Sequence, residues 1–130
     1  MKFGIVIVDE QSSFVHRNLP AAVETLKALG CAEQNILVRH APRLFNATMM
    51  TQFFAEYTDV DAVIILTESS PAPEYRAMLD GVTKLQIAWN MPVCIGDCTA
   101  ASEAVEMVSV QNEMEAAAPE HISPDRKAIN

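Results

Sequence analysis

Glycine and basic residues are scarce in this sequence. Of its 130 residues, four are glycine and nine are lysine or arginine, against 17 acidic residues, which gives a formal net charge of −8 at pH 7. Neither Gly-x-Gly-x-x-Gly nor Gly-x-x-x-x-Gly-Lys-[Ser/Thr] occurs, which removes the main support for a nucleotide site. The lack of a basic stripe argues against nucleic acid or an anionic membrane as a partner, because nothing would neutralise the phosphates.

Cysteines and long apolar stretches are also few. The three cysteines, Cys31, Cys94 and Cys98, are odd in number, and their spacing matches neither a disulfide framework nor a paired zinc site. No stretch approaches the roughly 18 apolar residues of a membrane span, and the opening MKFGIVIVDEQ has too short an apolar run for a signal peptide. We therefore expect a cytoplasmic protein with no membrane partner.

Apolar side chains, in contrast, make up 50% of the sequence. A chain of 130 residues with this content is long enough to bury a core within one domain. We place that domain at residues 1–117, because the segment APEHISPDRKAIN at 118–130 has two prolines, mixed charge and no hydrophobic period. That segment is expected to be a flexible C-terminal tail.

Four short β-branched runs alternate with longer helical patterns. The runs are FGIVIV at 3–8, NILVRH at 35–40, DAVIIL at 61–66 and MPVCIG at 91–96, and they suit strands covered on both faces. Helical spacing marks about 13–29, ending before Gly30, then about 46–57, 73–89, and a fourth helix with Thr99 as its N-cap. The alternation predicts an α/β fold with three αβα layers around a four-stranded parallel sheet, of the flavodoxin-like kind.

Four acidic residues are expected at the edge of the sheet where the strands end, which is where ligands bind in such folds. They are Asp9, Glu10, Glu68 and Asp97. Gathered there, their oxygens could hold one hard cation such as Mg²⁺, and the protein would then be a divalent-cation-dependent enzyme. The favoured alternative is that they are solvated acids, two of them at helix starts where negative charge is stabilised. We expect no bound metal and no other cofactor.

A small basic cluster and one cysteine belong to the same edge. Arg39, His40 and Arg43 indicate either an anionic ligand, such as a phosphate or carboxylate, or pairing with the neighbouring acids. Cys98 precedes a helix start, which could activate its thiol as a nucleophile, but an ordinary, partly buried thiol is favoured. Cys94 lies inside an expected strand and is assigned to the core.

Four longer segments follow one another in an order that is typical of one enzyme family. They are KFGIVIV, LPAAVETLKALGCAEQNILVRHAPRLFN, YTDVDAVIIL and MPVCIGDCTAASEA, and together they cover residues 2 to about 108. This order resembles the lumazine synthase family, whose members condense a ribitylamino-pyrimidinedione with a four-carbon phosphate ketone. The resemblance implies the same fold and a transferase activity in riboflavin biosynthesis.

The resemblance also implies which residues contact a ligand. After the first strand the family has an aromatic residue and an asparagine, where this chain has Glu10 and Gln11. After the second strand the family's Gly-Ala-Phe-Glu contacts the ribityl chain, and the matching residues here are Arg43, Leu44, Phe45 and Asn46. On the fourth strand, Ile95 replaces the family's aromatic residue before the glycine.

The segment after the third strand departs furthest from the family. The family has a Gly-rich loop ending in Thr-x-His, which contacts phosphate and supplies the histidine proposed for proton transfer. Here TESSPAPEYRAM is shorter and has neither glycine nor histidine. The candidates that remain are Glu68, Ser69 and Ser70 as ligand contacts and Glu74 as a proton-transfer group, so the catalytic residues are otherwise unknown.

Together these replacements predict a lumazine synthase-like protein of impaired or altered activity that binds a small anionic or polyol ligand between subunits. A functional lumazine synthase and the divalent-cation-dependent enzyme remain as alternatives. Because the family forms pentamers, the resemblance implies a homo-oligomer, with a pentamer favoured. The family's N-terminal arm, which joins the neighbouring sheet, has no counterpart before the first strand in this sequence.

Overall fold

The computed structural model describes residues 1–119, which form four strands and four α-helices. The strands are β1 (Phe3–Val8), β2 (Ile36–Ala41), β3 (Ala62–Leu66) and β4 (Val93–Gly96), and the helices are α1 (Ser12–Ala28), α2 (Ala47–Tyr57), α3 (Pro73–Trp89) and α4 (Ala100–Ala117). All eight predicted elements are present within a few residues of their expected bounds. The predicted tail lies outside the described residues from residue 120 onward.

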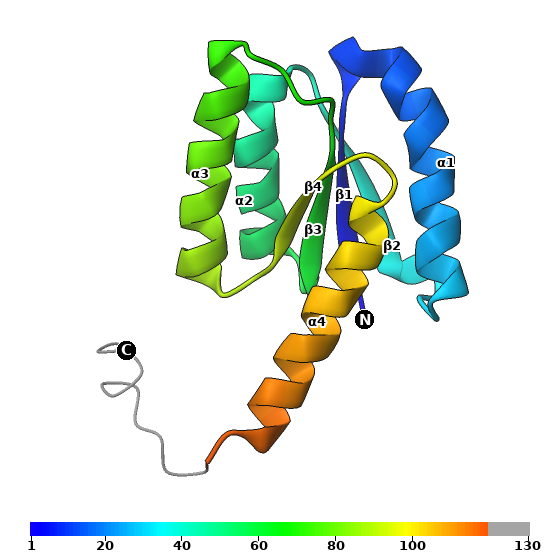
Figure 1. Cartoon of the computed structure of the whole chain (residues 1–130), viewed down its shortest axis with the longest axis vertical. Helices are drawn as coiled ribbons and strands as arrows, with labels where there is room; N and C mark the ends of the chain where they lie inside the picture. Colours follow the sequence, from blue (N-terminus) through cyan, green and yellow to red (C-terminus); the bar gives the residue numbers. More distant parts are fainter. Residues whose placement is uncertain (120–130) are drawn as a thin grey trace.

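The strands form one parallel sheet in the order β2-β1-β3-β4. β1 lies between β2 and β3, with Ile5 opposite both Val38 and Ile64. Helices α1 and α4 cover one face of the sheet, and α2 and α3 cover the other (Figure 1). The predicted three-layer, flavodoxin-like fold is therefore confirmed.

Alternation along β1 explains how one short strand serves two cores. Phe3, Ile5 and Ile7 are buried in the apolar cluster shared with α1 and α4. Val6 and Val8, which point to the opposite face, are buried in the cluster shared with α2 and α3. Successive side chains of a strand point to opposite faces, so a central strand covered on both sides has to be apolar at every position.

Two residues with left-handed backbone end helices and fix where the next strand starts. Gly30 follows α1 with φ of 99°, and the amide of Cys31 then donates to the Leu26 carbonyl at 2.9 Å. The predicted helix end before Gly30 is confirmed. Asn90 ends α3 with φ of 49°, a conformation that asparagine tolerates better than most residues. Within residues 1–119, no helix is long and apolar enough to cross a membrane.

Candidate functional site

Four connections come together at the carboxyl ends of the parallel strands, and we call this edge the rim. It consists of residues 9–11 after β1, 42–46 after β2, 67–72 after β3 and 97–99 after β4. In parallel α/β sheets this is the edge where ligands bind, since helix starts and loop side chains meet there. Most candidate residues of the sequence lie on the rim, whereas Ile95 is inside β4 and Glu74 is in the first turn of α3.

Gln11 ties the connection after β1 to the end of β3. Its Nε2 donates to Thr67 Oγ1 at 2.9 Å, and its Oε1 accepts the amide N–H of Glu68 at 3.0 Å. Thr67 is 2% exposed and its hydroxyl also donates to the Glu68 carbonyl at 3.2 Å. Because both ends of the Gln11 amide are already bonded within the protein, this side chain shapes the rim.

Glu10 makes a second tie, between the connections after β1 and β2. Its Oε1 accepts the backbone N–H of Leu44 at 3.0 Å, and its Oε2 lies 3.9 Å from Nε of Arg43. The Leu44 side chain is buried in the core, so this residue reaches the rim only through its backbone. The basic cluster therefore pairs at least in part with the neighbouring acids, which was one of the two alternatives from the sequence.

A groove of about 410 Å³ joins the second and third rim segments. It is lined by Arg43, Phe45, Asn46, Pro73 and Glu74. Four of these five residues are sequence candidates, and they come from two segments that lie some 30 positions apart in the chain. Phe45 is 62% exposed as a residue. The Asn46 Oδ1 accepts the amide N–H of Arg43 at 3.0 Å, which leaves the Asn46 NH₂ group for other partners.

The remaining candidates of the rim lie outside this groove. Glu68 and Ser69 are exposed, with Glu68 Oε1 3.9 Å from an Arg17 nitrogen. Ser70 Oγ accepts the amide N–H of Ala72 at 3.1 Å and so shapes the turn before α3. Ile95 is half-buried and packs against the core beneath α2 and α3.

Asp97 organises the start of α4. Its Oδ1 accepts the Thr99 hydroxyl at 2.6 Å and the Thr99 amide at 2.9 Å, and these two bonds hold the pKa of the Asp97 carboxyl below its usual range. Thr99 is the N-cap residue, but its side chain makes no cap hydrogen bond. The predicted start of α4 after Thr99 is confirmed, and the Thr99 hydroxyl bonds to Asp97 instead of to the helix backbone.

The four acids of the suggested metal site have separate protein partners. Asp9 pairs with His40, Glu10 with Arg43 and Leu44, Glu68 with Arg17, and Asp97 with Thr99. Within residues 1–119, no group of three or more His, Cys, Asp or Glu side chains is arranged to hold a metal ion. The geometry thus gives no support to the divalent-cation alternative.

A 6,7-dimethyl-8-ribityllumazine synthase of Bacteroides fragilis is 35% identical over 102 residues, which cover 74% of this chain and 71% of that enzyme. The chain belongs to the lumazine synthase family. Synthases of the same name from Porphyromonas gingivalis and Parabacteroides distasonis are each 28% identical, and the matches cover 65% and 64% of their lengths. No family model matches the chain.

The solved structures support the fold alone. A de novo designed Rossmann fold protein superposes with a TM-score of 0.52 over 84% of this chain and 98% of the design, at 16% sequence identity. The suspected membership of the lumazine synthase family is confirmed by the sequence relatives, and the flavodoxin-like sheet is consistent with it.

Two residues that the sequence placed at this edge, but did not single out as ligand contacts, shape the rim of this lumazine synthase-like chain. Thr67 anchors Gln11, and Pro73 forms part of the groove wall. Both carried a local signal. Thr67 is the first polar residue after a buried β-branched run, and Pro73 occupies the first position of α3, where its fixed φ favours a helix start.

The surroundings of Cys94 and Cys98, the two cysteines near the fourth strand, do not favour a nucleophilic thiol. Cys94 is 2% exposed, and burial, followed by the charge of Glu103 and a hydrogen bond to it, raises the pKa of its thiol to about 12. Cys98 is half-buried and packs against the apolar cluster between the sheet, α1 and α4, while its amide donates to Asn18 Oδ1 at 3.0 Å. These surroundings fit the favoured prediction of ordinary thiols.

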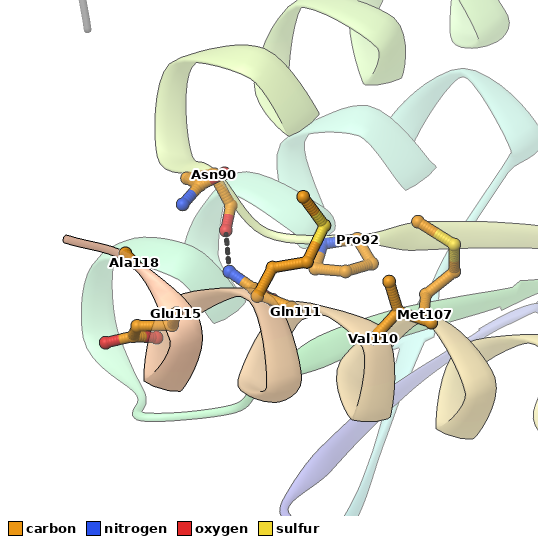
Figure 2. Close-up of a pocket in the computed structure, with 8 residues that line it drawn as sticks. Asn90, Pro92, Met107, Val110, Gln111, Glu115 and Ala118 are labelled. Atoms are coloured by element: carbon orange, nitrogen blue, oxygen red, sulfur yellow. Dashed lines mark hydrogen bonds between the residues drawn. The ribbon is translucent and has the colours of Figure 1, made fainter.

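A larger hollow, of about 580 Å³, lies at the opposite edge of the sheet. Figure 2 shows it between the end of α3 and the outer side of α4, with Pro92, Val110 and Met107 along it and the Gln111 side chain donating to the Asn90 carbonyl. It contains none of the rim residues. Because the titratable and amide groups of the candidate site are all on the other edge, we assign the chemistry to the smaller groove.

Proposed function

We propose that this chain is a lumazine synthase-type transferase of reduced activity, working in the cytoplasm, whose rim groove binds an anionic polyol substrate. The observation that carries the proposal is the meeting of Arg43, Phe45, Asn46 and Glu74 in one groove. These residues come from connections that follow different strands, and each supplies a different kind of contact.

The groove offers a charge, an amide and an aromatic face. The Arg43 guanidinium is exposed in a chain of net charge −8, so it is a local exception that favours a phosphate or carboxylate. The free NH₂ of Asn46 can donate to a sugar hydroxyl, and the exposed Phe45 ring offers a face for a planar heterocycle. Membership of the lumazine synthase family supports a ribityl-bearing ligand.

Reduced activity follows from what surrounds these groups. The Arg43 guanidinium lies 3.9 Å from the Glu10 carboxylate, and this negative charge weakens the attraction of Arg43 for an anion. Gln11 is committed to Thr67 and Glu68 instead of to a ligand. We therefore expect weak substrate binding, with most of the remaining rate coming from holding the two substrates together.

We further propose that the chain works as a homo-oligomer, most simply the pentamer that the family resemblance implies. The outer surface of α2 and α3 exposes large apolar side chains: Met49, Phe53, Tyr57, Ile87 and Trp89. Exposed apolar residues gathered on neighbouring helices favour an interface over open solvent. Native mass spectrometry should give a mass of several 14.3 kDa chains, and a monomer at micromolar concentration would refute this part of the proposal.

The test of the activity uses both precursors of lumazine and the fluorescence of the product. The purified chain should form lumazine above the uncatalysed background but more slowly than the Bacteroides fragilis relative measured beside it. Arg43→Gln should raise KM for the phosphate-bearing substrate several-fold, and Asn46→Ala should raise KM for the ribityl substrate. Arg76→Gln on α3, which does not line the groove, is the matched control and should change neither constant.

The outcomes separate the parts of this proposal. No turnover from a folded protein would refute the transferase activity. Turnover equal to that of the relative would refute the reduced activity. Turnover that is unchanged by Arg43→Gln and Asn46→Ala would move the binding site away from the groove.

A further inference from the structure

Helix α4 is longer than the core that supports it. Its buried residues all belong to its first half: Ala100, Ala101, Ala104 and Val108. In the described part of the chain, no residue of α4 after Val108 is buried, and the end of the helix runs past the edge of the sheet (Figure 1). Because helices in proteins are stabilised mainly by the packing of one face, the second half of α4 should have a further packing partner.

This part of α4 presents an apolar stripe to the larger hollow. Met107, Val110 and Met114 follow one another at spacings of three and four, which places them on one face of the helix. They are 47%, 42% and 70% exposed, and all three line the hollow of about 580 Å³ (Figure 2). The bond from Gln111 Nε2 to the Asn90 carbonyl, at 3.0 Å, holds α4 against the end of α3. The hollow is therefore formed without an occupant, and an occupant that fits it has apolar side chains.

The charges of α4 are all of one sign. The helix carries four glutamates, Glu103, Glu106, Glu113 and Glu115, and neither lysine nor arginine. Glu113 and Glu115 lie near its carboxyl end, where the helix dipole is already negative and a basic side chain would be stabilising. Glu115 also lines the hollow. An occupant with basic residues beside its apolar side chains is therefore complementary to this surface.

We propose that this hollow is the docking surface for residues 120–130 of the same chain. That segment follows almost directly from Ala118, which itself lines the hollow. Its sequence combines two isoleucines with the adjacent basic residues Arg126 and Lys127. The isoleucines cover the apolar stripe, and the basic pair meets the glutamates at the end of α4. This inference does not depend on the transferase activity proposed above.

Length and charge favour this occupant over a second copy of the chain. Along the helix axis, Met107 and Ala118 are about 17 Å apart. Residues 120–130 in extended conformation reach about 36 Å, so the segment is long enough to turn back along the whole stripe. Its attachment beside the hollow also keeps its effective concentration there high. The stripe of a second copy would instead place glutamates opposite glutamates, and like charges across an interface are unfavourable.

The experiment treats the full chain with a carbodiimide, which joins a lysine to a carboxylate that it touches, and maps the links by mass spectrometry. Ordinary and heavy-isotope chains are mixed in urea and refolded together, so that links within one chain can be told from links between chains. The expected major link joins Lys127 to Glu113 or Glu115 of the same chain. Met114→Ser should lower its yield several-fold, whereas Met114→Leu, which stays apolar, should keep it. Because Met114 is 70% exposed, neither variant should change the thermal melt appreciably.

Leu29→Ser is the matched control, since Leu29 is 47% exposed at the end of α1 and lies outside the hollow. It should leave the yield of the link at the wild-type level. An equal yield in Met114→Ser would overturn the docking, because the segment would then reach the glutamates without using the apolar stripe. Links mainly between ordinary and heavy chains would overturn it in favour of a second copy. No link from Lys127 to α4 would overturn it as well and leave the hollow to a different protein.

Discussion

Replacing Gln11 by alanine tests whether this residue holds the rim together. Two hydrogen bonds are lost, from Nε2 to the buried Thr67 hydroxyl and from the Glu68 amide to Oε1. Water can replace the bond at Glu68, which is exposed, so we assign it about 0.5 kcal/mol, and the bond to the buried hydroxyl about 1 kcal/mol. We expect Gln11→Ala to lower the free energy of unfolding by about 1.5 kcal/mol.

Urea unfolding followed by the fluorescence of Trp89, the single tryptophan, measures this change. A double-mutant cycle with Thr67→Val isolates the bond between the two side chains and should give a coupling of about 1 kcal/mol. Gln34→Ala, at an exposed position outside the rim, is the control and should cost less than about 0.5 kcal/mol. If the losses of unfolding free energy in Gln11→Ala and Thr67→Val add up to the loss in the double mutant, the hydrogen bond between these side chains does not contribute to stability.

Three further predictions concern packing, acid and thiol chemistry. A Cβ added at Gly4 would lie 2.7 Å from two ring carbons of Phe54, so Gly4→Ala should cost about 1–3 kcal/mol in urea unfolding, and Phe54→Leu should recover part of it. The pKa of Asp97 is lower in the folded protein than in the unfolded chain, so its carboxylate stabilises the folded state at a pH above the unfolded pKa. This stabilisation is lost as the pH falls through the folded pKa. In a plot of melting temperature against pH, Asp97→Asn should therefore show a shallower fall at acid pH than the wild-type protein. Because burial raises the pKa of Cys94 to about 12, a thiol reagent at pH 8 should label Cys98 well before Cys94 in the native protein.

Most of the fold could be predicted because hydrophobic period and helix-ending residues act locally. β1 and the end of α1 at Gly30 followed from short stretches of sequence. The fourth strand was predicted two residues too long at its start. Pro92 has no N–H to give to the sheet, but its carbonyl accepts the amide of Val63 at 3.0 Å, so a strand-like contact persists where the regular strand has not begun.

The sequence predicted where the candidate residues lie, but not which residues they bond to. Strand ends fixed which residues reach the rim, whereas the choice of partner depends on side-chain geometry that periodicity does not encode. Gln11 and Glu10 were both predicted as ligand contacts, yet the first bonds to Thr67 and the second to the backbone of Leu44. Asp9 was predicted as a solvated acid, with a metal ligand as the alternative, and in the structure its carboxylate contacts the imidazole of His40.

The sheet by itself decides little about what this chain does. A designed protein with 16% identity has a similar arrangement of strands and helices, so the fold needs no particular rim chemistry. The Bacteroides fragilis synthase shares 35% of the aligned residues, which shows the family but does not decide whether the chemistry is retained. Whether the chemistry is retained depends on a small set of side chains at the ends of β1 and β2. There, Glu10 opposes the charge of Arg43 while Asp9 holds the ring of His40. Because the carboxylate of Glu10 weakens the attraction of Arg43 for an anion, we expect the proposed transferase activity to show a high KM.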